Sequence, residues 1–271
     1  MKKIKLLLTL TLLTSMLAGC LQVETTVKVE KDGSGTINET VLFSKNFVKM
    51  VKDFVEAFKD SASTEEFSMF EESKIKADAL NFGVGVKYVS HEVIKNDDWE
   101  GYQAVYVFDD ITKVKLTPDP ESKVDLDENE TAVSPEDYYY FSFVRGDTPE
   151  LIIDRPEIEF ESNTSEDSGD STQVTQNDDE AGEEFMKLME GMKIDIAVEV
   201  EGEIVNTNAS YVQGSKVTLF QMDLSEMMKN KDVFNDFKKN EPQNIDELKF
   251  YLEKLGGLKI QVEKPVTIKF E

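Results

Sequence analysis

The sequence of 271 residues has one cysteine, one histidine and one tryptophan. A single cysteine excludes an intrachain disulfide, and one cysteine with one histidine excludes a zinc site built from the usual ligands. No serine stands in a nucleophile-elbow context, and no glycine-rich loop carries a lysine that would bind phosphate. These absences argue against most hydrolases and transferases, and no pattern calls for a cofactor.

Positive charge is scarce. The chain has 30 Lys and Arg against 55 Asp and Glu, a net charge of −25. A protein of this charge is repelled by the phosphates of nucleic acids, so we exclude nucleic acid as a partner. Solubility is the ordinary reason for such acidity, and a specific cationic partner is the alternative.

Long apolar runs are scarce as well, apart from one near the N-terminus. Three lysines in the first five residues precede an apolar stretch from Leu6 to Leu17. The stretch is too short to span a bilayer as a helix, and small residues follow it, as in a signal peptide. Leu17, Ala18, Gly19 and Cys20 resemble the lipobox of bacterial lipoproteins.

We therefore expect residues 1–19 to be removed and Cys20 to be lipid-modified, for example with palmitate. Removal of residues 1–19 takes away three lysines and no acid, which changes the net charge to −28. The alternative is a secreted protein in which Cys20 is a free thiol or lies within the removed segment. Leu21, rather than Asp, follows the cysteine, which favours the outer membrane if the host is Gram-negative. The expected location is extracytoplasmic, at a membrane surface.

The remaining pattern predicts an α+β fold of antiparallel hairpins with several packed helices. Asp32-Gly33 separates two alternating runs and predicts a hairpin. Ser44 and Asn244 are placed to cap helices. Strands are expected at 22–30, 36–43, 84–116 (a pair split by 96–98), 138–144, 150–153, 193–205 and 216–222 (a hairpin through 211–215) and 258–270, with a break or edge at Pro265; helices are expected at 44–58, 63–79, 183–192 and 245–255.

The composition divides the chain into four parts. Residues 1–19 are the signal peptide, and 20–160 are the N-terminal part of the α+β domain. Residues 161–182 are acidic and polar, and we expect them to be disordered because they cannot bury enough apolar surface to offset their ordering entropy. Residues 183–271 are the C-terminal part of the domain.

Two stretches together show a family resemblance. The run from Val23 to Thr36, directly after the lipobox, resembles the opening strand and hairpin of LppM-like bacterial lipoproteins. Residues 202–209 and 214–219 resemble that family's later strand, asparagine-bearing turn and return strand, although Leu219-Phe220 stands where the family usually has an aromatic such as Trp. The resemblance implies a lipid-anchored extracytoplasmic α+β domain and carries over no catalytic residue.

Two candidate sites follow from spacing, and each has an ordinary alternative. Asp125, Asp127, Asn129 and Glu136 have the spacing of calcium ligands in an EF-hand loop, but Glu130 replaces the required glycine, which favours a solvated acidic loop. A helical stripe could form an apolar face for an acyl chain or a partner, or could simply be core; its members are Phe47, Met50, Phe54 and Phe58.

The lone His91 lies in a strand-like run, where a surface or half-buried histidine is more common than a catalytic base. We therefore expect a non-enzymatic cell-envelope module that binds a lipid or an envelope protein at the membrane surface. The alternative is a glycan-active hydrolase that uses two carboxylates about 5 to 10 Å apart.

Overall fold

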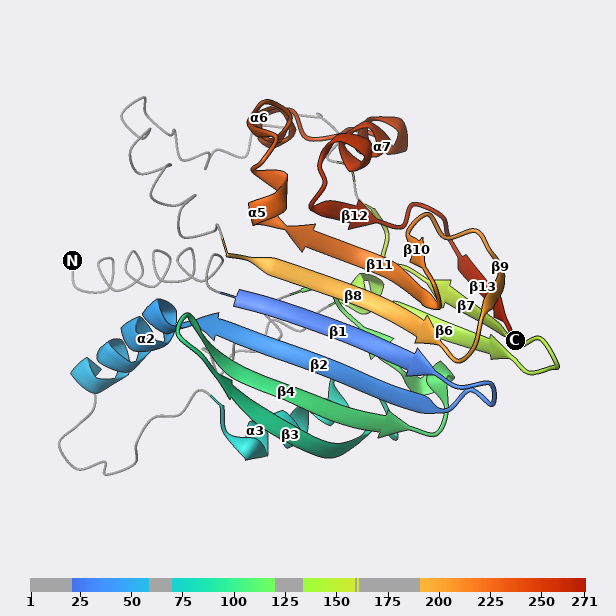
Figure 1. Ribbon diagram of the computed structural model, residues 1–271, viewed down its shortest axis with the longest axis horizontal. Helices are drawn as coiled ribbons and strands as arrows, with labels where there is room; N and C mark the ends of the chain where they lie inside the picture. Colours follow the sequence, from blue (N-terminus) through green and yellow to red (C-terminus); the bar gives the residue numbers. More distant parts are fainter. Residues whose placement is uncertain (1–20, 59–69, 120–133, 159, 161–190) are drawn as a thin grey trace.

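The computed structural model describes residues 21–58, 70–119, 134–158, 160 and 191–271, with backbone alone at 54–58 and 135. Two β-sheets lie face to face, and helices lie beside them (Figure 1). This α+β architecture confirms the fold class expected from the sequence. The segments predicted as signal peptide (1–19) and as a disordered stretch (161–182) lie outside the described residues.

The large sheet has the strand order β10-β11-β8-β1-β2-β4-β3, and β12 pairs with β11. The parallel pairing of β1 with β8 joins the N-terminal and C-terminal parts of the chain within this sheet. Its strands are β1 (Leu21–Val29), β2 (Gly35–Ser44), β3 (Lys87–Lys95), β4 (Trp99–Phe108), β8 (Lys193–Val200), β10 (Val212–Gln213), β11 (Lys216–Asp223) and β12 (Leu258–Ile260).

The small sheet has the order β5-β6-β7-β13-β9, and its pairings are antiparallel. Its strands are β5 (Lys115–Leu116), β6 (Tyr139–Val144), β7 (Glu150–Asp154), β9 (Ile204–Thr207) and β13 (Val266–Phe270). The helices and 3₁₀ turns are α2 (Lys45–Phe58), α3 (Glu72–Ala77), η2 (Asp78–Leu80), η3 (Ile111–Lys113), η5 (Pro135–Asp137), α5 (Leu224–Met227), α6 (Lys231–Lys239) and α7 (Ile245–Lys254).

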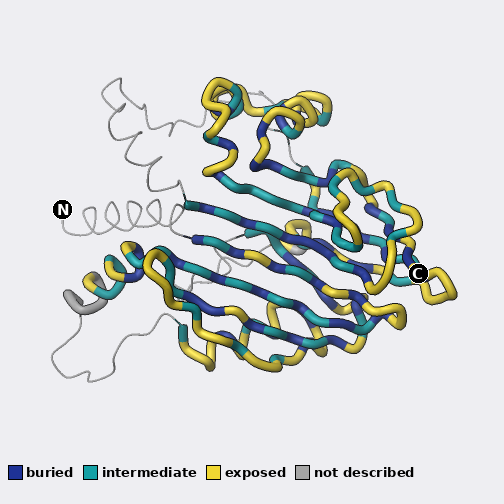
Figure 2. The backbone as a smooth tube through the Cα atoms, in the orientation of Figure 1, coloured by how far each residue is buried: buried dark blue, intermediate teal, exposed yellow. Residues whose placement is uncertain are grey.

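The main core lies between the two sheets, because every second residue of strands such as β1, β2, β4 and β13 points inward. Val27 and Ile37 of the large sheet and Ile268 of the small sheet have no exposed surface. Each such side chain contributes roughly 1.5 to 3 kcal/mol through removal from water. A second cluster lies under α5, α6 and α7, where Met227 and Leu255 are buried. Figure 2 shows this alternation along the strands of the large sheet.

Local predictions hold best where a turn or cap determines the structure. The β1–β2 and β3–β4 hairpins are confirmed. Ser44 Oγ accepts the Phe47 N–H at 3.3 Å, and Asn244 Oδ1 accepts the Glu247 N–H at 3.0 Å, so both predicted caps are confirmed. Residues 63–69 of the helix expected at 63–79 lie outside the described residues, Phe70 and Glu71 are not helical, and the helix begins at Glu72; most of the helix expected at 183–192 also lies outside the described residues.

Two expected strands are divided between the sheets. The prediction of one strand at 193–205 is wrong. This run forms β8, which belongs to the large sheet, and β9, which belongs to the small sheet. The chain turns at Gly202, whose φ of 87° suits glycine. The run 258–270 breaks before the cis Lys264–Pro265 bond, as Pro265 suggested, and its halves also lie in different sheets.

Candidate functional site

The first strand begins directly after the predicted lipidation residue. Leu21 starts β1, is buried and pairs with Phe43 of β2. Gln22 Nε2 donates a hydrogen bond to the Gly191 carbonyl at 3.3 Å, which ties β1 to the segment before β8. Cys20, Leu17, Ala18 and Gly19 lie outside the described residues. Cys20 is bonded to Leu21, the first residue of β1.

We call this part of the molecule the Leu21 end, defined by Leu21, Ser44, Trp99 and Lys193. Leu21 pairs with Phe43, and the next residue of β2, Ser44, pairs with Trp99 of β4. Trp99, the single tryptophan of the chain, therefore lies one residue beyond the Leu21 row, on the side from which the chain enters β1. Helix α2 starts here and extends past the ends of the strands (Figure 1).

Helix α2 docks on the core with one side of its first two turns. Phe47 and Val48 are buried, and the Phe47 ring stacks on Phe43 with centroids 5.5 Å apart. Met50 is half-buried against the main core. Phe47 thus packs in the core, and the side chains of Phe54 and Phe58 lie outside those described.

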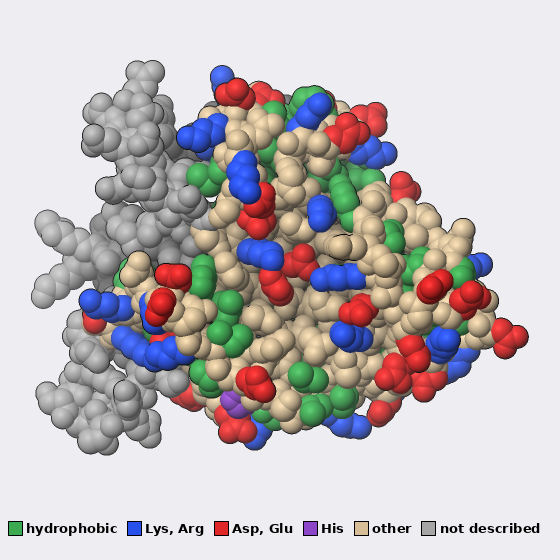
Figure 3. Space-filling view, viewed as in Figure 1, with side chains coloured by type: hydrophobic (Ala, Val, Ile, Leu, Met, Phe, Trp, Pro, Cys, Tyr) green, Lys and Arg blue, Asp and Glu red, His purple; other side chains and the backbone are tan. Residues whose placement is uncertain are grey.

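The charged side of α2 carries three lysines within about 60° of the helix circumference. They are Lys45, Lys49 and Lys52, of which Lys49 is exposed. Lys52 Nζ lies 4.0 Å from Glu100 Oε1, and Figure 3 shows the lysines of α2 facing the viewer. With Asp53 and Glu56, the helix has a net charge of +1 in a chain of −25.

Over β1, β8 and β11 the outer face of the large sheet is polar, and the described elements leave it open (Figures 1 and 3). Alternating positions of β1, β8 and β11 place charges side by side, and cross-strand ion pairs neutralise them. These pairs are Lys28–Glu199 at 3.4 Å, Lys216–Asp195 at 3.7 Å and Lys193–Glu24. On these three strands, the outer face therefore carries paired charges rather than charge of one sign.

One carboxylate lies inside the core. Glu39 occupies an inward position of β2 between Ile37 and Val41 and has no exposed surface. The Tyr102 hydroxyl lies 3.4 Å from Glu39 Oε2 and 3.3 Å from Asp78 Oδ2. Burial, reinforced by the two carboxylates, raises the pKa of Tyr102 well above its usual range.

The two carboxylates contact one hydroxyl, yet Glu39 is closed to solvent. In this arrangement the pair cannot contact an external glycan. Sequence reasoning missed Glu39, although its place in the inward register of an apolar strand was a usable signal.

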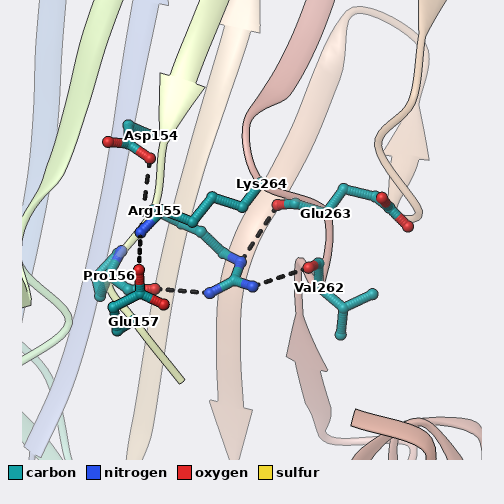
Figure 4. A network of polar contacts seen from close by, with 7 residues as sticks. All are labelled: Asp154, Arg155, Pro156, Glu157, Val262, Glu263 and Lys264. Atoms are coloured by element: carbon teal, nitrogen blue, oxygen red, sulfur yellow. Dashed lines mark hydrogen bonds and ion pairs between the residues drawn. The ribbon is translucent and has the colours of Figure 1, made fainter. Parts of the chain in front are cut away.

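A second buried charge, Arg155, connects the end of β7 to the segment between β12 and β13 (Figure 4). Its Nε donates to the Glu263 carbonyl at 3.2 Å, Nη1 to Pro156 at 2.7 Å and Nη2 to Val262 at 2.9 Å. Lys264, next to these carbonyls, lies 2.5 Å from Glu157 Oε1. All three guanidinium nitrogens of Arg155 donate hydrogen bonds to main-chain carbonyls, so this network has a structural role.

A shallow cavity of about 490 Å³ lies between α6 and α7. Glu247 and Tyr251 are among its lining residues. The Glu247 carboxylate accepts the Gln243 N–H at 2.9 Å, and the Tyr251 hydroxyl donates to Asp236 Oδ2 at 2.9 Å. These two hydrogen bonds hold the ends of α6 and α7, so we assign Glu247 and Tyr251 a structural role.

The calcium hypothesis stays a prediction. Asp125, Asp127 and Asn129 lie outside the described residues, while Glu136 is exposed in η5, with its N–H 3.5 Å from Ser134 Oγ. Within the described ranges, no three His, Cys, Asp or Glu side chains gather as metal ligands. His91 is half-buried, and its Nδ1 lies 2.7 Å from the Tyr88 hydroxyl.

Comparisons with known proteins give one structural likeness. No family model matches the chain, and no curated protein matches it by sequence. Among solved structures, it is similar to the NMR structure of the folded domain of LppM from Mycobacterium tuberculosis. The match covers 77% of this chain and 85% of that one, at 14% identity and a TM-score of 0.29.

The match names the family that the sequence resembles, but a TM-score of 0.29 does not establish a shared fold. At this TM-score, the likeness carries no inference about ligand, activity or site residues. In the part of the chain that the structure describes, no helix is long and apolar enough to cross a membrane.

Proposed function

We propose that this chain is an LppM-like lipoprotein of the cell envelope, anchored by lipid on Cys20, that binds a lipid or protein ligand without catalysing a reaction. The observation that carries the proposal is the junction of lipobox and fold. Leu17-Ala18-Gly19-Cys20 ends one residue before a strand at the centre of the large sheet. An anchor there would hold the whole domain at the membrane surface.

The binding role is supported by the open outer face of the large sheet. It spans several strands, and its charges are mutually neutralised rather than of one sign. Such a surface suits a protein partner or a polar lipid headgroup better than a highly charged ligand. The buried position of Glu39 argues against the carboxylate pair of the rival hydrolase at that place.

Anchoring is tested by the intact mass of the chain purified from its own host. The wild type should lack residues 1–19 and carry acyl chains on Cys20, and Cys20→Ser should carry no acyl chain. The double variant Cys20→Ser with Ser15→Cys is a matched control, because it keeps one thiol but loses the lipobox spacing. An unmodified wild-type Cys20 would refute the anchor.

Ligand binding is tested by a native mass spectrum of Cys20→Ser in which an ordinary cleavable secretion signal replaces residues 1–19, so that the host secretes the domain for gentle purification. A mass excess that fragments to a lipid supports lipid binding. A bare mass, followed by a specific crosslink to an envelope protein in intact cells, supports a protein ligand. A bare mass with no crosslink would refute the binding role.

A further inference from the structure

The register of the large sheet determines how the domain would meet a membrane. Ser44 and Trp99 pair one residue beyond the Leu21 row. Trp99 lies two strands from β1, which is about 10 Å at the usual strand spacing. A lipid on Cys20 brings the bilayer surface to this level, because no linker separates Cys20 from β1.

Helix α2 occupies the same level. It begins at Lys45, directly after Ser44, and its 14 residues span about 21 Å. The first two turns are held on the core by Phe47 and Val48, so the start of the helix cannot swing away without exposing them. Because α2 extends past the strand ends, a membrane surface held there by a lipid on Cys20 would contact the helix (Figure 1).

Two kinds of residue placed there are common at membrane surfaces, and they lie beside the exposed Asp97 and Asp98 of the β3–β4 turn. Tryptophan favours the boundary between headgroups and acyl chains, and lysines on a helix interact with lipid phosphates. Trp99 is the single tryptophan of the chain, and α2 has a positive net charge although the chain is strongly acidic. Lys45 and Lys49 lie on the charged side of α2.

We propose that the Leu21 end, through Trp99 and the lysines of α2, is a second membrane contact that makes the anchored domain stand on its strand ends. This inference rests on the proposed lipid anchor and adds an orientation to it. The opposite end, at the β1–β2 turn, would then point away from the bilayer by about 30 Å, the length of the nine-residue β1. The outer face of the large sheet would remain open for a partner.

The single tryptophan provides the test. The lipidated full chain is reconstituted in vesicles of phosphatidylcholine and phosphatidylglycerol in which one lipid carries bromine near the headgroup. Trp99 emission should be strongly quenched. Two relocated reporters should be quenched far less: Trp99→Phe with Gln103→Trp, on the outer face, and Trp99→Phe with Val144→Trp, at the opposite end.

Charge reversal tests the lysines separately. Lys45→Glu with Lys49→Glu should remove most of the quenching of Trp99 while the protein still floats with the vesicles. Lys31→Glu with Lys113→Glu changes the same charge at exposed positions near the opposite end and should behave as the wild type.

Flotation of the protein with the vesicles distinguishes a failure of the lipid anchor from a failure of the proposed orientation. A protein that floats with Trp99 unquenched, or with Gln103→Trp quenched as strongly, keeps the anchor and overturns the orientation. A protein that does not float refutes the anchor and the orientation with it.

Discussion

Replacement of Arg155 by methionine should destabilise the domain by about 3 kcal/mol. Arg155 is 8% exposed and donates three hydrogen bonds to main-chain carbonyls. Hydrogen bonds from a charged donor contribute about 1.5 to 3 kcal/mol each, and carbonyls left buried without a donor cost about 1 to 3 kcal/mol. The net loss of stability is smaller than the total of these contributions, because replacement by methionine also removes the cost of burying the charged guanidinium.

The assay measures the urea unfolding of residues 20–271, carrying Cys20→Ser, and circular dichroism monitors the loss of structure. In a domain of this size, a loss of 3 kcal/mol lowers the melting temperature by roughly 6 to 12 °C. Arg155→Lys should retain part of the stability, because an ammonium cannot reach all three carbonyls in the guanidinium geometry.

Arg145→Met is the matched control. Arg145 is exposed, and its Nε donates to a single carbonyl, that of Asp32, at 3.1 Å. Its replacement should change the unfolding free energy by less than about 0.5 kcal/mol. If Arg155→Met were as stable as Arg145→Met, the carbonyls near Val262 would not depend on the guanidinium and the reasoning would be wrong.

Three further perturbations test other parts of the fold. Asn244→Ala should cost about 1 kcal/mol by removing the cap of α7, whereas Asn230→Ala should cost less in the same urea assay, because Asn230 makes no side-chain cap of α6. Ile268→Ala empties a fully buried site between the sheets and should cost about 2 to 5 kcal/mol; a loss below 1 kcal/mol would mean that the core collapses around the cavity. The unfolding free energy should be constant as the pH approaches about 10 and fall above it, because burial raises the pKa of three tyrosines in the folded state while the unfolded chain titrates near 10. The three tyrosines are Tyr102, Tyr106 and Tyr139. Their phenolate absorbance should appear only when the protein unfolds, and its appearance in the folded protein would contradict their burial.

Turns and caps could be predicted because their physics is local. The β1–β2 turn needs a residue of positive φ, and Gly33 has a φ of 86°. Asp32 Oδ1 accepts the Ser34 N–H at 2.8 Å, within the same few residues. Ser44 likewise caps α2 through an N–H three residues later. In each case, the partner lies close along the chain, so the residue types alone indicate the structure.

The candidate sites were only partly accessible to such reasoning. The aromatic stripe of α2 was recognised, but whether Phe47 faces a ligand or the core depends on Phe43 of a neighbouring strand. Tyr139 and Phe141 are buried while Tyr140 is 42% exposed, as alternation in a strand predicts. Arg155 gave no signal at all, because its three partners are main-chain carbonyls, which every residue has.

The sequence by itself determined the hairpins, the helix caps, the alternation that builds two apolar faces, and the lipobox prediction. Only the tertiary structure decided that β1 pairs in parallel with β8, that the runs 193–205 and 258–270 divide between two sheets, and that Glu39 and Arg155 are buried. A period of two specifies which side of a strand is apolar, and not which strand lies beside it. The neighbour depends on contacts between residues more than a hundred positions apart, such as Gln22 with Lys193, and these exist only in the folded chain.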